Sequence, residues 1–232
     1  MFNPPEKGDG EFRTPEACDL HLDQGVRRQG VHAYRGAAYL EESTEDDFCF
    51  RVLTKSHKLH SRFFSECPRA AARSKKRESI RLGQNEKTWY YQNGCRLITV
   101  PVPKGGLLLW DSRMVYDFVH PVCGRPNTDR WTCISFVSMT PALWADQDDL
   151  DMKSKVFKEL LTTSHWSSQW QHIISEDRPK KRKHDGEWVE ETVAVKYLPA
   201  AALWYPCQKL MGQMEYSFEN EESNGPTPPT WK

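Results

Sequence analysis

The sequence predicts a mainly β core with added helices, arranged as one domain followed by a tail. Three observations support this fold class. Between Asp19 and Met139, short β-like runs alternate with turn signals. After Thr140-Pro141 the pattern changes to that of an amphipathic helix. The length of 232 residues and the mass of 27.0 kDa suit a single well-buried β-barrel or sandwich.

The expected strands lie in the first part of the chain. Residues 31–41 and 48–54 are β-like runs, and residues 89–102 hold one or two more. A break at Lys104-Gly105-Gly106 precedes residues 107–110, a continuous apolar stretch that suits a strand covered on both faces. Residues 130–138 predict a further strand.

The remaining segments predict helices, loops and a tail. Residues 67–85 are basic and alternate poorly, which indicates a helix or loop whose charge belongs to a solvated face. Residues 146–162 predict an amphipathic helix, and Asp148 and Asp149 suit its first turn. Residues 219–232 are acidic and contain Gly and Pro, so we expect a flexible tail.

The charge balance favours some classes of partner over others. Lys and Arg together number 32, as do Asp and Glu, and this zero net charge argues against a nucleic-acid partner. Residues 180–183 resemble a nuclear-import signal, although an exposed loop has the same composition. No apolar run reaches membrane-spanning length, and seven cysteines without a framework spacing favour a reducing compartment. We therefore expect an intracellular, cytoplasmic or nuclear protein without a membrane partner.

The pair His21 and Asp23 has the spacing of two ligands in a mononuclear iron site. Residues two apart on an extended strand point to the same side, so this imidazole and this carboxylate converge. Two His and one carboxylate on one face of the metal are the ligands of non-haem Fe(II) oxygenases. The tripeptide alone is weak evidence, because a surface strand or turn also explains it.

Further motifs make the chain resemble the phytanoyl-CoA dioxygenase family of Fe(II)- and 2-oxoglutarate-dependent oxygenases. The resemblance covers roughly residues 18–175 and rests on motifs in the family's order: His21-Leu22-Asp23-Gln24, the strand ending at Gly36, Ser56-His57-Lys58, Trp110-Asp111-Ser112-Arg113 and Thr163-Ser164-His165-Trp166. It implies a double-stranded β-helix, a jelly-roll or cupin-like barrel with the metal at its open mouth.

The implied domain organisation follows from the extent of the resemblance. The oxygenase-like domain would cover residues 18–175, after an N-terminal extension over residues 1–17. A C-terminal extension with the basic loop would cover residues 176–218, and the tail residues 219–232.

The resemblance also assigns roles to residues. His21 and Asp23 match the first two iron ligands, and Arg130 matches the residue that binds the distal carboxylate of 2-oxoglutarate, which a guanidinium can hold bidentately. Thr132 shares the strand face of Arg130 and can add a hydrogen bond, and Tyr34 is a candidate co-substrate contact. The implied oxidoreductase activity is hydroxylation of an unidentified small organic substrate with dioxygen.

The third iron ligand departs from the family pattern. Family members carry His three residues after the Arg of Trp-Asp-Ser-Arg, where this chain has Tyr116, and the nearest histidine is His120. His120 is favoured, because neutral imidazole binds Fe(II) readily and a phenol must first lose a proton near pH 10. Tyr116, or a site with two protein ligands, is the alternative. A straight strand separates the two positions by about 13 Å, so His120 would need a bulge or shifted turn to reach the metal.

A second departure is the short segment before His21, where family members carry helices that brace the barrel. A shortened member, a fragment, or a chain that completes itself by association with another copy would each explain it. Together with Tyr116, this departure motivates a rival hypothesis from another class: a catalytically inactive member that keeps the fold as a binding or scaffold module.

Overall fold

The computed structural model describes residues 2–3, 5, 19–164, 166–169, 171–175, 180–182, 188–190, 198, 200–214 and 230–231. The chain forms two compact units, one of Met1–Met139 with Pro228–Lys232 and the other of Thr140–Thr227. The division falls after Met139, whereas the family resemblance implied one domain as far as residue 175. Each unit is described by itself.

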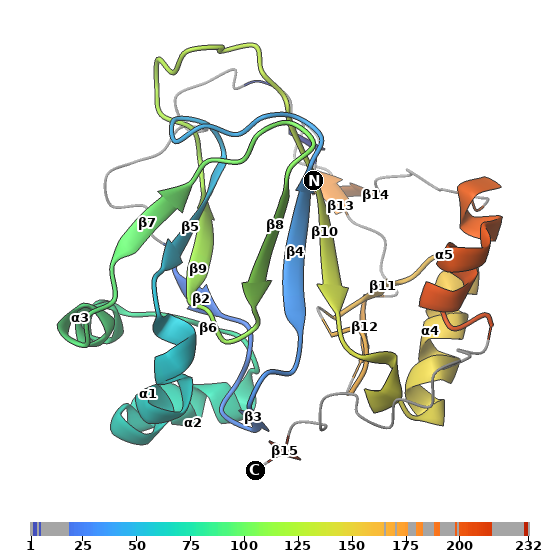
Figure 1. The fold of residues 1–232 in the computed structure, drawn as a ribbon, viewed down its shortest axis with the longest axis horizontal. Coiled ribbons are helices and arrows are strands. Elements are labelled where there is room, and N and C mark those ends of the chain that lie inside the picture. Colours follow the sequence, from blue (N-terminus) through green and yellow to red (C-terminus); the bar gives the residue numbers. More distant parts are fainter. Residues whose placement is uncertain are drawn as a thin grey trace. The chain divides into compact units, whose positions relative to one another are not determined.

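The first unit is mainly antiparallel β-sheet with added helices, as the sequence predicts (Figure 1). One sheet has four strands, in the order β1 (Phe2–Asn3), β10 (Thr132–Met139), β4 (Tyr34–Tyr39) and β8 (Leu107–Asp111). The other has five, in the order β6 (Ile80–Arg81), β2 (His21–Leu22), β9 (Tyr116–Val119), β5 (Cys49–Leu53) and β7 (Leu97–Val100). A short strand β3 (Arg28–Gln29) pairs with β15 (Thr230–Trp231).

The chain passes repeatedly from one sheet to the other. Strand β4 lies in the four-stranded sheet, β5 and β7 in the five-stranded sheet, β8 in the first again, β9 in the second and β10 in the first. The strands of these two sheets do not join into one closed barrel among the described residues. Both sheets contribute to one buried cluster, because their inward side chains pack together; its fully or largely buried members include Ala37, Tyr39, Phe50, Val52, Trp110, Tyr116 and Ile134.

Helices cover the other core of the first unit, at the lower end of the five-stranded sheet in Figure 1. They are the 3-10 turn η2 (Ser56–Leu59), α1 (His60–Glu66), α2 (Pro68–Lys76) and α3 (Gln84–Gln92). The aromatic side chains of Phe63 and Tyr90 are fully buried there, with ring centroids 4.9 Å apart. Residues 67–85, for which a helix or loop was expected, thus contain α2, β6 and the start of α3.

The structure corrects one of the strand predictions and narrows another to a single strand. Residues 89–102 contain one strand, β7, because α3 continues through Gln92; the helix starts where the Glu86 carboxylate accepts a hydrogen bond from the Gly83 amide at 2.7 Å. Strand β8 is not covered on both faces, since Leu107 and Leu109 are 57% and 53% exposed while Trp110 points into the core. A continuous apolar run therefore does not by itself show two-sided burial.

The second unit contains the predicted amphipathic helix as α4 (Gln147–Glu159), which begins where Asp146 accepts a hydrogen bond from the Asp149 amide at 2.9 Å. Its other elements are η3 (Ala142–Trp144), β11 (Thr162–Thr163), β12 (Ile173–Ser175), β13 (Lys180–Arg182), β14 (Trp188–Glu190), η4 (Ala200–Leu203) and α5 (Tyr205–Leu210).

Several sequence-based expectations lie largely outside the described residues. Residues 180–182 of the basic loop form β13, but their side chains, Lys183 and most of residues 219–232 are not described, and neither is His165. Over the part of the chain that is described, no helix has the length and apolar character needed to cross a membrane. The six cysteines within that part are free thiols: Cys49, Cys67, Cys95, Cys123, Cys133 and Cys207.

Candidate functional site

His21 and Asp23 converge at the end of β2, as their spacing predicts. His21 Nε2 lies 3.8 Å from Asp23 Oδ1. His21 Nδ1 lies 3.1 Å from the Asp19 carbonyl oxygen, and because that oxygen can only accept, the neutral ring carries its proton on Nδ1 and a lone pair on Nε2. The two side chains thus present an imidazole lone pair and a carboxylate to the same side of the strand.

The third side chain at this place is Tyr116. Strand β9 pairs with β2 so that Tyr116 is opposite His21, with ring centroids 4.5 Å apart. The Tyr116 hydroxyl donates a hydrogen bond of 2.6 Å to Asp23 Oδ2. Burial, together with the neighbouring charge of Asp23, raises the pKa of Tyr116 far above its usual value. The phenol is therefore protonated and donates to Asp23.

A buried guanidinium completes the surroundings of Asp23. Arg35, on β4, is 4% exposed and places Nε 3.9 Å from Asp23 Oδ2. Its NH1 donates to Ser138 Oγ of β10 at 3.2 Å. Burial lowers the pKa of Arg35 and the charge of Asp23 works against that change, but a guanidinium remains cationic in proteins. Asp23 is thus compensated by a protein cation at close range.

Tyr34 lies on the other face of β4. It pairs in register with Asp111 and Met139 and is 55% exposed, whereas its neighbour Arg35 points into the core. The position of Tyr34 differs from the expectation for a co-substrate contact, because strand alternation turns successive side chains to opposite faces.

His120 lies beyond the other end of β9. The register between β9 and β5 runs without a break from Tyr116 to Val119, so the bulge that would bring His120 towards His21 is absent from this described pair of strands. His120 is exposed and its ring centroid is 5.9 Å from that of Phe48. Four residues of extended strand separate it from Tyr116, which is about 13 Å.

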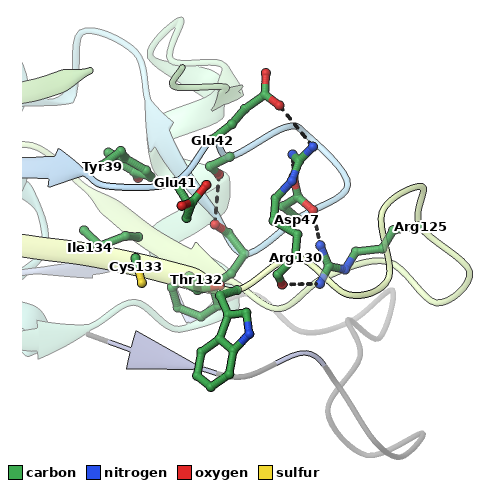
Figure 2. A pocket seen from close by; sticks show the side chains of 12 residues that line it. Tyr39, Glu41, Glu42, Asp47, Arg125, Arg130, Thr132, Cys133 and Ile134 are labelled. Carbon is green, nitrogen blue, oxygen red and sulfur yellow. Dashed lines mark hydrogen bonds and ion pairs between the residues drawn. The ribbon is translucent and has the colours of Figure 1, made fainter. Parts of the chain in front are cut away.

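Arg130 and Thr132 occupy a different place, shown in Figure 2. Arg130 NH1 donates to Asp47 Oδ2 at 2.8 Å, and its NH2 lies 3.0 Å from Glu42 Oε2. Arg125 forms an ion pair with Asp47 and donates to the Arg130 carbonyl at 3.0 Å. Burial favours the protonated form of Asp47, but hydrogen bonds from Thr44 and Arg125 and the charge of Arg130 outweigh it and lower the pKa of Asp47. Arg130 therefore already contacts two carboxylates of its own chain.

These side chains line a pocket whose inner wall includes Tyr39 (Figure 2). Tyr39 is 1% exposed, and its hydroxyl has no hydrogen-bond partner among the residues that the structure describes. Burial raises the pKa of Tyr39 well above its usual value, so the hydroxyl remains a neutral donor. Tyr39 and Arg35 belong to the same strand four residues apart, which places the pocket about 13 Å from the surroundings of Asp23.

Aromatic side chains fill the core between the two places. The ring centroid of Phe50 is 4.8 Å from that of Trp110 and 5.3 Å from that of Tyr116, and Trp110 and Tyr116 are 5.2 Å apart. Contacts at these distances are those of close-packed aromatic side chains. The His21–Asp23 cluster and the Arg130 pocket are therefore separate sites.

The residues around Asp23 do not supply a three-ligand iron centre. Within the described part of the chain, no three His, Cys, Asp or Glu side chains gather where they could hold an ion. His21 and Asp23 are present, but the third position holds the Tyr116 phenol, which donates to Asp23 Oδ2, the same oxygen that lies 3.9 Å from Arg35 Nε. Of these residue types, only His21 and Asp23 come together here, and Tyr116 is the third side chain beside them.

Comparison with known proteins yields one distant relative. The chain is 22% identical over 154 residues to the Ava biosynthesis cluster protein O of Aspergillus versicolor. The match covers 65% of this chain and 48% of that protein, so the chain spans about half the length of the curated relative it matches. No family model matches the chain, and no solved structure matches it.

The sequence contains a signal that distinguishes Arg35 and Tyr39 from Tyr34. The signal that separates them is parity, because Arg35 and Tyr39 share one strand face and Tyr34 occupies the other. Asp47 and Glu42 were not among the candidate site residues. Their contacts with Arg130 cross 83 and 88 positions of sequence, and no local spacing indicates such pairs.

Proposed function

We propose that this chain is a catalytically inactive relative of the phytanoyl-CoA dioxygenases that uses a double-stranded β-helix as a binding module. The repeated passage of the chain between two antiparallel sheets that share a core supports this fold. The position of His21 at the end of β2, opposite the first residue of β9, supports the likeness to the oxygenases.

One observation carries the proposal of inactivity: the Tyr116 hydroxyl donates to Asp23 at 2.6 Å in the position where the third ligand is expected. The hydrogen bond occupies Asp23 Oδ2, so the carboxylate can no longer offer both of its oxygens to an ion. Arg35 compensates the charge of Asp23 from the inside of the same core. Asp23, Tyr116 and Arg35 thus form an internal polar cluster, which stabilises the junction of β2, β4 and β9.

The pocket beside Arg130 is the proposed ligand site of the module, and its ligand is a small organic carboxylate. Of the two carboxylates on Arg130, Asp47 is buried and Glu42 is 51% exposed at the side-chain level. A ligand carboxylate can take the place of Glu42 on the guanidinium, at the opening of the pocket whose inner wall includes Tyr39. The relative's printed name, which refers to a biosynthesis cluster, fits a small-molecule ligand.

The second candidate function is an Fe(II)- and 2-oxoglutarate-dependent dioxygenase with two protein ligands. It is favoured by the lone pair of His21 Nε2 and by Asp23 Oδ1, which lie 3.8 Å apart on one side of β2. The bound iron and co-substrate would supply the oxidising chemistry for hydroxylation of a small substrate. In this case Arg130 would not hold the co-substrate, because a five-carbon chain is shorter than two extended residues, about 7 Å, and the sites are about 13 Å apart.

An anaerobic titration with Fe(II) and 2-oxoglutarate distinguishes the two functions. We expect no visible metal-to-ligand charge-transfer band for the wild type, and a band for Tyr116→His, because that variant removes the donor and adds a third ligand, the second imidazole of the site. His120→Ala is the control and should match the wild type. A band in the wild type that is lost in His21→Ala would establish the dioxygenase and overturn the inactive assignment.

Calorimetric titration with succinate and with 2-oxoglutarate tests the pocket. We expect Glu42→Gln to bind either acid several-fold more tightly than the wild type does, because the competing carboxylate is gone. Asp46→Asn, on the same loop but not in the pocket, is the matched control and should leave affinity unchanged. No heat with either acid in wild type and Glu42→Gln would exclude these carboxylates as ligands.

A further inference from the structure

The segment from Lys55 to Arg96 is strongly basic, although the whole chain has no net charge. It contains eleven Lys and Arg against three Glu, whereas each class totals 32 over the full sequence. The zero total therefore conceals a separation of charge along the chain. The structure folds this segment into the helical layer of α1, α2 and α3 at one end of the five-stranded sheet (Figure 1).

Only some of these cations have carboxylate partners. Arg62 pairs with Glu66 at 2.6 Å and Arg73 with Glu86 at 2.9 Å, while Glu78 pairs with the buried Arg28, which lies outside the segment. These three pairs use all three Glu of the basic segment. The structure leaves a second group of exposed cations on and around α2 that have no carboxylate partner among the described residues: Arg27, Arg69, Lys75, Lys76 and Arg77.

These five cations, which we call the α2 basic face, are held on one surface by local packing. Ala70 and Ser74 form the buried side of α2, and Ser74 Oγ accepts a hydrogen bond of 2.8 Å from the Val26 amide. The same turn carries Arg27, whose NH2 donates to the Lys75 carbonyl at 3.3 Å. The turn before β3 and the C-terminal half of α2 thus share one surface.

The α2 basic face is not explained by the helix alone. Cations in the last turn interact favourably with the helix dipole, which accounts for Lys75 and Lys76, but not for Arg69 in the first turn, where the dipole opposes a positive charge. Clustered like charges repel one another. A surface that keeps five of them without acidic partners fits an anionic partner.

We propose that the α2 basic face binds the phosphate backbone of a nucleic acid without reading its sequence. Arg69 and Lys76 are seven residues apart, about 10 Å along the helix axis, which is enough to contact successive phosphates of one strand. Three of the five cations are Arg, whose planar fork binds phosphate bidentately. A membrane surface fits less well, because the exposed residues of α2 include no large apolar side chain that could insert.

The test is the salt dependence of binding to a fluorescein-labelled duplex DNA, followed by anisotropy. If three to five cations contact phosphate, the slope of log K against log [salt] is about −3 to −4.5, and the association constant falls about 60- to 500-fold between 50 and 200 mM salt. Lys75→Gln/Lys76→Gln should make the slope less steep by about 2. The matched control, Lys155→Gln/Lys158→Gln on α4, should leave it unchanged.

Three results would overturn the proposal. One is no binding of the duplex at 50 mM salt, and another is an equal loss of binding in the α2 and α4 variants. The third is displacement of the DNA by a poly-glutamate peptide at equal charge concentration, which would assign the surface to an acidic protein. All four substituted lysines are exposed, and equal thermal melting of wild type and variants would confirm that a changed slope reports the surface.

Discussion

At the scale of single residues, two buried ion clusters define the sites of this protein. Asp23 is satisfied by Tyr116 and Arg35, and Asp47 by Arg125, Arg130 and Thr44. In both clusters a buried carboxylate is compensated by guanidinium groups from distant parts of the sequence. Removing one charge of such a cluster leaves the others buried without compensation. The loss of folding stability is therefore larger than when an exposed ion pair is broken.

The Asp47 cluster should be important for stability. Asp47→Asn keeps the shape but removes the charge that Arg125 and Arg130 share, so we expect the free energy of unfolding at pH 7 to fall by about 3 kcal/mol. Because the pKa of Asp47 is lowered in the folded protein, its contribution is complete above about pH 4 and is lost as pH falls further, so the deficit should shrink at pH 3. Urea unfolding at both pH values measures this, with the exposed Asp46→Asn as control. A deficit below 1 kcal/mol at pH 7 would contradict it.

His60 should make stability depend on pH around neutrality. Its Nε2 donates to the Gln24 carbonyl at 2.9 Å, its Nδ1 is buried without a hydrogen-bond partner among the described residues, and burial lowers its pKa. The unfolded chain therefore takes up a proton first as pH falls below about 6.5, and the folded state loses stability. We expect Tm to fall from pH 7.5 to 5.5 by less in His60→Gln, which retains an N–H donor, than in the wild type. Equal decreases would refute this role.

At the scale of secondary-structure elements, the turn after His-x-Asp is fitted closely against α2 and β6. A Cβ at Gly25 would lie 2.8 Å from Ser74 Oγ and 3.0 Å from the Glu78 carbonyl oxygen. The second contact is with backbone, which cannot rotate away. Gly25 therefore fixes the distance between this turn and the segment that follows α2.

We expect Gly25→Ala to destabilise the protein by about 1–3 kcal/mol, as overpacking of a filled site does. Equilibrium unfolding in urea measures the change. The reverse result, a variant as stable as the wild type, would mean that the segment around Glu78 moves aside freely. In that case the turn would not position Asp23.

The sequence predicted the elements better than the sites. Strands β4, β5, β8 and β10 and helix α4 were recovered because alternation and amphipathic periodicity are local patterns. Helix α3 was missed, since the aromatic run around Trp89 is typical of strands, whereas packing of Tyr90 in the core decides for a helix. The convergence of His21 and Asp23 follows from local spacing, but the contacts of Arg35 and Arg130 depend on which strands become neighbours.

At the scale of the whole molecule, the net charge does not describe the charge of each surface. A chain with no net charge has an isoelectric point of about 7.1, yet the α2 basic face is positive at any pH near that value. The net charge of the whole chain therefore bears on its solubility but does not give the charge of any one surface.

Removal of metal should leave stability unchanged. An ion bound at 100 times its dissociation constant would add about 2.7 kcal/mol, or roughly 5–10 °C in Tm for a chain of this size. We expect the Tm of the wild type to be the same within about 1 °C with EDTA or with Fe(II) under anaerobic conditions, and the Tm of Tyr116→His to rise with Fe(II). A wild-type Tm that falls on chelation would show that the protein carries a structural or catalytic ion.

The pairing of β2 with β9 has a consequence for how this protein acquires its fold. The hydrogen bond between Tyr116 and Asp23 joins residues 93 positions apart, and β4 pairs with β10 over a similar separation. Each sheet pairs strands that are far apart in the sequence. Closing the long loops between them costs conformational entropy before these contacts can form. Refolding on a timescale of milliseconds to seconds, with a transition state that already joins both ends of the first unit, is the expected kinetic signature.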